Sequence, residues 1–476
     1  MDKSDPARLT KDLSSLVMGV SSQGLEVRGR LTRVTPHAIT FEVCTPLAVL
    51  RSAEVLTDFK IVLDQRLVYS GKAVISGLVN AGSPLICEAS LQDEWLEEDL
   101  FTLTSRKDQL RSSYQAFLHQ WHRAYRILPE FKLLVADMQA FLTELRLWLD
   151  QVEMGVRATA SDGQSQLERD SVGELGQSLV PSLNLLFEKF ERVADAVPAD
   201  LAPAHHRFLK QQLHPLVLCA PFAWRTFTKP LGYAGDYEMV NMILRDPQEG
   251  SSLYAKLLNV WFISQPPAEA HRNRIELLTS RLIEETVRVS AEQRPIRIFN
   301  LGCGPASEVE RFLAAGPLAN HAQFALLDFN QETLDYAARV LQQSKQRHQR
   351  RTGLRFVKKS VTQLLRSAAR GGQNGQQYDY LYCAGLFDYL PDWVCKQLMA
   401  IFYDMLAPGG LVVATNVDKC NPIRHMLDYV LEWHLIYRNA RQLRALVPAA
   451  ARAEDARVSA DPTGINLCLE VRRPAA

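Results

Sequence analysis

The first strand-forming part of the chain lies between about residues 24 and 91. Short segments rich in β-branched residues, such as LEVRGRLTRV, HAITFEV, FKIVL and LICEASL, alternate there with turn signals. The turns include Thr35-Pro36, Ser70-Gly71 and residues 81–84. This pattern predicts five or six short strands that form a small antiparallel barrel or sandwich.

The hydrophobic period becomes helical between about residues 94 and 196. Apolar side chains recur there at steps of three and four, as on one face of a helix. The stripe comprises Leu110, Tyr114, Phe117, Trp121, Tyr125, Leu128, Phe131, Leu134, Met138, Phe141, Leu145 and Leu149. The polar stretch ATASDGQSQLERDS, residues 158–171, predicts a loop, and an amphipathic helix follows from Leu175 to Val193. The middle of the chain is therefore predicted to be an α-helical bundle.

From Arg294 onward the pattern alternates between strands and helices. Apolar segments such as RIFNL, FALLDF, YDYLYCA and LVVATNV are each followed by a helical stretch, except the last. The final strands, near residues 456–459 and 467–472, flank the turn-rich DPTGIN and suit an antiparallel hairpin. The pattern predicts a doubly wound α/β domain. We expect three domains in all, over residues 1–95, 96–290 and 291–476.

Composition agrees with several globular domains and narrows the partners. The 476 residues are 47% hydrophobic and 22% charged, which is unlike a disordered chain. The net charge of +1 argues against nucleic-acid binding. No apolar run reaches the roughly 18 residues of a membrane span, and the polar start MDKSDPARLTKDLSS shows no signal peptide, so we expect a cytoplasmic protein. The 8 cysteines are scattered without metal-site spacing, so no metal is expected.

The strongest chemical signal is the segment IRIFNLGCGPASEVERFL. An apolar strand runs there into Gly302-Cys303-Gly304, and a helix follows, so that backbone can approach a ligand at the carboxyl edge of the sheet. A plain tight turn would give a similar pattern, and Ser307 breaks a G-x-G-x-x-G motif. Asp328 ends the next strand, where a carboxylate can accept two hydrogen bonds from ribose hydroxyls.

These features together resemble a class I S-adenosylmethionine-dependent methyltransferase over about residues 294–473. The resemblance rests on the glycine turn, the acid at 328, the strand YDYLYC before Ala384-Gly385, the LAPGG turn and the terminal hairpin. It implies a Rossmann-like methyltransferase domain that binds S-adenosylmethionine. The implied cofactor-binding residues are Asn300, Gly302, Cys303, Gly304, Asp328, Phe329, Ser360, Val361 and Arg274.

The chain departs from that family pattern at two places. Ala306 replaces the third glycine of the loop. The acid often found after the third strand is absent, and Ser360 and Thr362 stand there. Contacts to the adenine base are therefore less defined than contacts to the ribose.

Four further segments resemble bacterial methyltransferases that make 3-hydroxypalmitic acid methyl ester, a fatty-acid quorum-sensing signal. They are FTKPLGYAGDYEMVNMIL (residues 227–244), HRNR (271–274), GLFDYLPD (385–392) and NVDKCNPIRHMLDYVLEWHLIYR (416–438). The resemblance implies methyl-ester formation on the carboxylate of a hydroxy fatty acid, beneath a helical lid or tunnel. There are two alternatives. The chain could methylate another acceptor, or it could be a sensor or scaffold that only binds the cofactor.

The chemistry singles out a few side chains in these segments. A carboxylate acceptor needs alignment rather than a base. Tyrosine hydroxyls at 233, 237 and 389 are candidates to orient it, and Arg272 or Arg274 to pair with it or with the carboxylate of the cofactor. A hydroxyl or amine acceptor needs a base, for which Asp388, His425, Glu432 and His434 are candidates. The predicted catalytic set is Tyr233, Tyr389, Asp388 and His425.

Each of these residues also has a structural interpretation. Tyr233 and Tyr237 suit packing at a helix start, whose N-cap is predicted at Gly235 or Asp236. The side chain of Asp388 suits a helix cap. The histidines at 425 and 434 would share one amphipathic helix with apolar neighbours.

The amino-terminal strands weakly resemble the PilZ domain, a barrel that binds cyclic di-GMP in some bacterial proteins. That binding uses an R-x-x-x-R segment, whereas Arg28, Arg30 and Arg33 have other spacings here, and the second motif is also absent. We therefore expect no cyclic di-GMP binding, and a role for the barrel in dimerisation or docking. The helical stripes suit a homodimer or internal packing equally.

Overall fold

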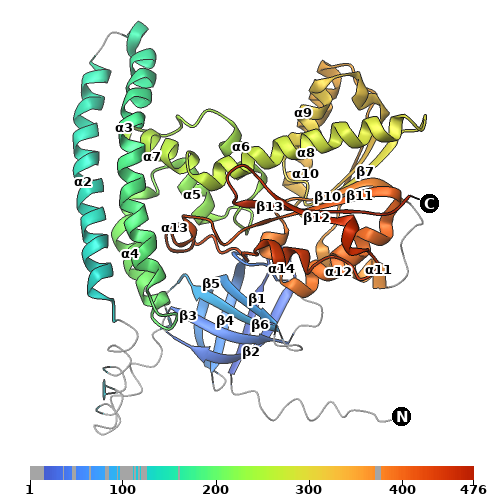
Figure 1. The fold of residues 1–476 in the computed structure, drawn as a ribbon. Helices are drawn as coiled ribbons and strands as arrows, with labels where there is room; N and C mark the ends of the chain where they lie inside the picture. The colour runs from blue at the N-terminus through green and yellow to red at the C-terminus, as the bar shows by residue number, and fades with distance from the viewer. Residues whose placement is uncertain are drawn as a thin grey trace, which may run out of the picture.

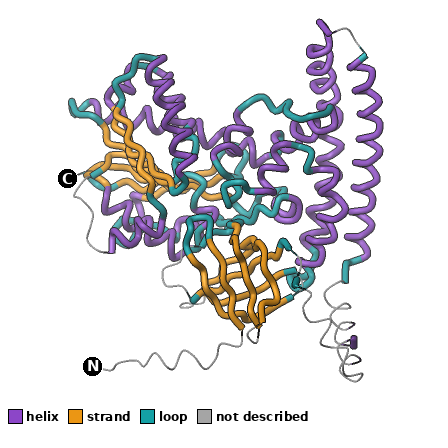
Figure 2. Tube along the Cα trace, turned by 180° about the vertical axis from the view of Figure 1, so that it is seen from behind, coloured by secondary structure: helices purple, strands orange, loops and turns teal. Residues whose placement is uncertain are grey.

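The structure is a computed structural model of the 476-residue chain. It describes residues 15–35, 37–44, 50–63, 66–80, 85–93, 95–96, 111, 114, 115, 118, 126–158, 161–369 and 377–475. Three bodies follow one another along the chain: a β-barrel, a set of helices that includes two long helices side by side, and a mixed sheet with helices (Figure 1). Figure 2 shows from behind that the barrel lies against both the helices and the sheet-containing part.

Six antiparallel strands close the amino-terminal barrel in the order β1-β2-β3-β6-β5-β4. Their bounds are β1 Ser15–Val20, β2 Glu26–Val34, β3 Ala38–Val43, β4 Val55–Leu63, β5 Arg66–Asn80 and β6 Leu85–Leu91. The pattern did not predict β1, because its short apolar run adjoins the polar start of the chain. This strand pairs with β2 on one side and β4 on the other, and so closes the barrel around Phe41, Phe59 and Tyr69.

The helical part begins with α2 (Pro129–Arg157), α3 (Ser161–Asp195) and α4 (Ala202–Val217), packed on one another. The loop predicted over residues 158–171 is wrong, because α3 already begins at Ser161. The polar residues between 164 and 171 lie on exposed or half-buried positions of a helix whose inner face is apolar. Most of the predicted stripe between residues 110 and 125 lies outside the described residues.

Four more helices connect the pair to the sheet. They are α5 (Pro221–Thr228), α6 (Tyr237–Leu244), α7 (Leu253–Ile263) and α8 (Pro266–Ser290). The side chain of Asp236 accepts from the Met239 backbone N–H at 2.9 Å, so this residue is the N-cap of α6 and confirms the prediction. The apolar helix α7 packs against α2, α3 and α5, which makes it the centre of the helical core.

The carboxyl-terminal sheet has seven strands in the order β12-β13-β11-β10-β7-β8-β9. Their bounds are β7 Ile296–Leu301, β8 Ala322–Asp328, β9 Gly353–Lys358, β10 Tyr378–Cys383, β11 Leu406–Val417, β12 Ala456–Ala460 and β13 Asn466–Arg472. The strands β7 to β11 pair in parallel, whereas β13 is antiparallel to both β11 and β12. This confirms the predicted α/β sheet with a terminal hairpin, which is the fold implied by the methyltransferase resemblance. The exact domain limits stay a prediction.

Helices cover both faces of the sheet, as in a doubly wound fold. On one face α8 packs with α9 (Ser307–Ala315) and α10 (Gln331–Arg347). On the other lie α11 (Val361–Ala369), α12 (Asp392–Met405) and α14 (Ala440–Arg444). Short 3-10 helices η3 (Pro317–His321), η4 (Phe387–Tyr389) and η5 (Ala453–Asp455) complete the connections. The strand order reverses between the neighbouring strands β7 and β10. In such a sheet this reversal leaves an opening at the carboxyl ends of the two strands.

The helix α13 (Arg424–Val430) is shorter than the sequence pattern suggests. The predicted amphipathic helix carrying both histidines is wrong, because the helix ends before Leu431 and Glu432 takes a left-handed φ of 48°. Residues 432–439 instead have no regular secondary structure, and the Arg438 N–H donates to the Val417 carbonyl at the end of β11 at 3.1 Å. Among the described helices none is long and apolar enough to cross a membrane.

Candidate active site

The glycine turn lies at the carboxyl end of β7 and is held by the neighbouring strand. The backbone N–H groups of Gly302 and Cys303 donate to the Leu327 carbonyl at 2.8 and 3.0 Å. Gly302 and Gly304 have φ values of 73° and 53°, in the left-handed region that favours glycine. A Cβ built at Gly304 would meet no atom within 4 Å, so it would point into open space. The turn therefore exposes backbone to a pocket.

Asp328 ends β8, the strand next to β7, and lies beside this turn. Its carboxylate accepts from the backbone N–H groups of Gly304 at 3.3 Å and Asn330 at 3.0 Å. Burial raises the pKa of this carboxyl group, while the two N–H donors and the nearby Arg51 charge oppose the rise. The predicted ribose acid thus lines the same pocket as the glycine turn.

Aromatic and apolar side chains form the outer wall of this first pocket. The rings of Tyr233 and Phe329 lie 5.1 Å apart between centroids, and Val361 lies on the same lining. Ser360, also predicted to bind the cofactor, does not line this pocket. Its hydroxyl accepts from the Gln363 N–H at 3.2 Å at the start of α11. We call this space the nucleoside pocket, after the ligand that the sequence resemblance implies.

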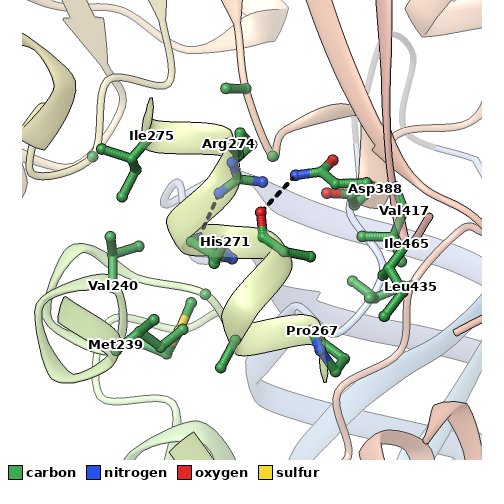
Figure 3. A pocket seen from close by; sticks show the side chains of 18 of the residues that line it. Met239, Val240, Pro267, His271, Arg274, Ile275, Asp388, Val417, Leu435 and Ile465 are labelled. Carbon is green, nitrogen blue, oxygen red and sulfur yellow. Dashed lines mark hydrogen bonds between the residues drawn. The ribbon is translucent and has the colours of Figure 1, made fainter. Parts of the chain in front are cut away.

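A second cavity opens beside the nucleoside pocket and shares Gly302, Gly304 and Tyr389 with it. It contains about 1240 Å³ of empty space, part of which is open to solvent. Apolar side chains from α6, α8 and the segments after β11 dominate its lining, as Figure 3 shows for several of them. The labelled apolar residues are Met239, Val240, Pro267, Ile275, Val417, Leu435 and Ile465. We call this space the apolar cavity.

Arg274 on α8 brings a positive charge into the apolar cavity. Its side chain is buried, with 8% of the residue exposed, and its guanidinium contacts the imidazole of His271 (Figure 3). A Cβ at Gly385, which has φ 79°, would lie 2.9 Å from Arg274 Nη1, so glycine lets the guanidinium approach the end of β10. Burial lowers the pKa of the His271 imidazole well below its ordinary value, which keeps this ring neutral.

Arg272, two residues earlier on α8, points elsewhere. Its guanidinium donates to the carbonyls of Ile243 and Ile263 and pairs with Glu269 at 2.9 Å. It lines neither pocket. Of the two arginines considered from the sequence, the structure brings only Arg274 to the site.

The side chains at 388 and 389 lie on η4, just after β10. The Asp388 carboxylate accepts from the Val417 N–H at 2.7 Å, and it does not cap α12, whose N-cap is Pro391. The Tyr389 hydroxyl accepts from Trp433 Nε1 at 2.8 Å. Burial raises the pKa of both groups, and both line the apolar cavity.

A small polar cluster lines the apolar cavity beside the glycine turn. Asn300 donates from Nδ2 to Glu308 at 3.3 Å, and the Tyr382 hydroxyl donates to the same carboxylate at 2.7 Å. Asn300 Oδ1 is buried and has no hydrogen-bond partner. The thiol of Cys303 is buried beside this cluster, and burial raises its pKa, so it stays a neutral lining group.

Three of the sequence-based candidates lie outside both pockets. His425 faces α3, where its imidazole contacts Asp195 at 3.2 Å. Glu432 pairs with Lys210, and His434 contacts Asp428, in a separate cleft between the barrel and α4. Tyr237 does line the nucleoside pocket, but its hydroxyl donates to Glu332 at 2.8 Å.

The sequence analysis missed two contributions to the site. His271 belongs to the HRNR segment, which could have indicated it. Arg51 and Ser52 of the barrel line the nucleoside pocket, although no motif marks them. No group of three metal-binding side chains occurs within the described ranges.

Comparisons with known proteins give similarities to solved structures only. No protein-family model matches the chain, and neither does any curated protein. A Bordetella parapertussis protein described as a possible exported protein is 19% identical over 53% of this chain and 86% of its own, with a TM-score of 0.39. The magnesium protoporphyrin IX methyltransferase of Synechocystis PCC 6803, with bound SAH, is 12% identical over 49% of this chain and 91% of its own, with a TM-score of 0.34.

A third solved structure is the N-methyltransferase NodS from Bradyrhizobium japonicum WM9 in complex with S-adenosyl-l-homocysteine. It is 15% identical over 50% of this chain and 98% of its own, with a TM-score of 0.30. At such identities the roles of individual residues have to be assigned from this chain's own geometry.

Proposed function

We propose that this chain is an S-adenosylmethionine-dependent O-methyltransferase that forms a methyl ester on the carboxylate of a long-chain fatty acid. A 3-hydroxy fatty acid is the preferred acceptor, and the ester would serve as a signal. The observation that carries the proposal is the junction of the nucleoside pocket with the apolar cavity. The buried Arg274 guanidinium contacts His271 there and forms no salt bridge among the described residues, although Asp388 lies within electrostatic range.

The residues of the nucleoside pocket suit the proposed cofactor. The carboxylate of Asp328 can accept from ribose hydroxyls, and in the adjoining apolar cavity the orphaned Asn300 Oδ1 can accept from an ammonium group. Open space at Gly304 admits ligand atoms close to the backbone. When bound, the cofactor supplies an electrophilic methyl group on its sulfonium.

The apolar cavity suits an acceptor with an anionic head and a long apolar tail. Arg274 can bind the carboxylate, and the Tyr389 hydroxyl, which accepts from Trp433, keeps its own proton to donate. A fatty carboxylate is ionised near neutral pH, so the chain need only align it and exclude water. Helices of the predicted domain 96–290 supply much of the apolar wall.

The reaction is tested with labelled S-adenosylmethionine and a panel of free and 3-hydroxy fatty acids. The wild-type chain should yield a labelled product that mild alkali cleaves, as an ester requires. Arg274→Ala should lower kcat/KM by about two orders of magnitude, because it removes the partner of a buried carboxylate. The matched control, Arg272→Ala, changes an arginine on the same helix outside the cavity and should keep most activity.

The same assay separates a second candidate function. Asp388 is a buried carboxylate in the cavity, and burial raises its pKa, which suits a base for a hydroxyl acceptor. A labelled product that resists alkali and is lost in Asp388→Asn would favour that candidate. A wild-type chain that binds the cofactor but makes no product from the fatty-acid panel would overturn the fatty-acid proposal.

A further inference from the structure

The barrel reaches the nucleoside pocket through residues 50–54, which precede β4. All five residues are buried, although they belong to a connection between two strands. The Ser52 N–H donates to the Tyr389 carbonyl at 3.1 Å, and the Val55 N–H donates to the Gly232 carbonyl at 2.9 Å. The barrel is thus joined by backbone hydrogen bonds to two different walls of the site.

A buried carboxylate fixes the shape of this connection. Glu54 accepts from the backbone N–H of Ser22 at 3.0 Å and from its hydroxyl at 2.6 Å, and it also accepts from the Arg51 N–H at 2.9 Å. Glu54 also forms an antiparallel bridge with Tyr233. Ala53, which directly precedes Glu54, takes a left-handed φ of 59° and packs into the core of the helices. The backbone that carries Arg51 is therefore held from both ends.

The side chain of Arg51 is buried at the rim of the nucleoside pocket with unused donors. Only 5% of the residue is exposed, and its guanidinium carbon lies 4.1 Å from the centroid of the Phe329 ring. Its Nε is buried without a hydrogen-bond partner. Its guanidinium forms no salt bridge among the described residues, although the carboxylates of Glu54 and Asp328 lie within electrostatic range. A buried guanidinium is costly to leave without acceptors, so the position suits a ligand that supplies them.

We propose that Arg51 of the barrel is a cofactor-binding residue that closes the nucleoside end of the site. Asp328 sets the position of the ribose, and Phe329, the next residue, lies beyond it with the guanidinium over its ring. A purine offers ring-nitrogen acceptors and a flat π-face, and a planar guanidinium can engage both. The inference rests on the proposed function and deepens it, because it makes the barrel part of the cofactor site.

The test measures binding by calorimetry, with S-adenosylhomocysteine and with methylthioadenosine, which lacks the amino-acid end. Arg51→Ala should weaken both ligands by the same factor, about tenfold, since stacking and donor contacts act on the shared adenosine. Arg51→Lys should fall between, because it keeps the charge and loses the planar fork. Arg33→Ala, an exposed arginine on β2 of the same barrel, should match wild type.

Two outcomes would overturn the inference and leave the proposed function intact. One is wild-type affinity in Arg51→Ala, and another is a loss restricted to S-adenosylhomocysteine, which would place Arg51 at the amino-acid end. If Arg51→Ala does not fold, Arg51→Met keeps the apolar stem and is held to the same result. A wild-type chain that binds neither ligand would overturn the proposed function as well, whereas wild-type binding with an unchanged variant overturns this inference alone.

Discussion

The nucleoside pocket and the apolar cavity share a boundary but are built in different ways. The nucleoside pocket depends on backbone: a turn held by the Leu327 carbonyl and a strand-end carboxylate that receives two N–H donors. The apolar cavity depends on side chains that come from α6, α8 and the segments after β11. Each contains a buried arginine that forms no salt bridge among the described residues, although a carboxylate lies within electrostatic range: Asp328 for Arg51 and Asp388 for Arg274.

This difference separates two kinds of selectivity. Backbone groups have a fixed chemistry, so the nucleoside pocket constrains which cofactor binds and tolerates few changes. Packed side chains can be exchanged with modest loss, so under the proposed function the apolar cavity would set the length and shape of the acceptor. Substitutions at the two regions should therefore act on different ligands.

The largest effect is expected at Asp328. Asp328→Ala removes the carboxylate that would accept charge-assisted hydrogen bonds from the ribose. Such bonds contribute about 1.5–3 kcal/mol each, so cofactor affinity should fall by roughly a hundredfold or more. Calorimetry with S-adenosylhomocysteine checks this, and fatty-acid binding should stay near wild type. Asp335→Ala on the exposed side of α10 is the control. An equal loss of both ligands would show that the two regions are not independent.

An intermediate effect is expected from filling the apolar cavity. Met426 of α13 lines it, and Met426→Trp would displace several methylene groups of a long acceptor. At about 0.8 kcal/mol per buried methylene, three groups correspond to roughly fiftyfold weaker binding of the longest acids. Short acids and the cofactor should keep their affinities, and Met426→Leu should resemble wild type. An equal loss of affinity for short and long fatty acids would contradict the proposal that the apolar cavity holds the fatty-acid tail.

The smallest effect concerns the pH dependence of the wall that carries Met426. Glu191 of α3 accepts from the backbone N–H groups of His425 at 3.0 Å and Met426 at 2.7 Å, and burial raises its pKa to about 7. Because its pKa is higher in the folded state, protonated Glu191 stabilises the fold. This contribution is fully present below the pKa of the unfolded chain, near 4.5, and is lost as pH rises through about 7.

Thermal unfolding across that range measures the effect. Wild type should lose roughly 2–4 °C more between pH 5 and pH 8 than Glu191→Gln, which does not titrate. Glu188→Gln, at an exposed position of the same helix, should follow wild type. Parallel curves for wild type and Glu191→Gln would remove Glu191 as the origin of the pH dependence.

The glycine turn and the acid of the nucleoside pocket were predictable because they are local in sequence. Three other residues predicted to bind the cofactor, Asn300, Cys303 and Arg274, line the apolar cavity instead. A strand, a glycine turn and a helix succeed one another, and the acid at 328 follows at the next strand end. The same holds for the N-cap at Asp236, which depends on a bond to the third residue after it. Parallel strands with both faces covered also leave a strong apolar pattern.

The remaining features depend on tertiary contacts that leave no local pattern. Arg51 reaches the site only because the barrel is joined to the helices through Glu54 and Tyr233, far apart in the chain. The first turns of α3 are polar enough to resemble a loop, yet its apolar residues pack on α2 and α7. The segment after Val430 shows the opposite case, since Glu432 leaves the helical region although the apolar period continues.

The hydrogen bond from the Val55 amide to the Gly232 carbonyl crosses from the barrel to the site. A ligand that contacts groups on both sides of this bond is thermodynamically linked to the bond, and the linkage is reciprocal. If docking of the barrel tightens the ligand tenfold, the ligand stabilises docking by about 1.4 kcal/mol. The exchange rate of that single amide proton would then report the occupancy of the site, so the barrel would sense whether the methyl donor is present.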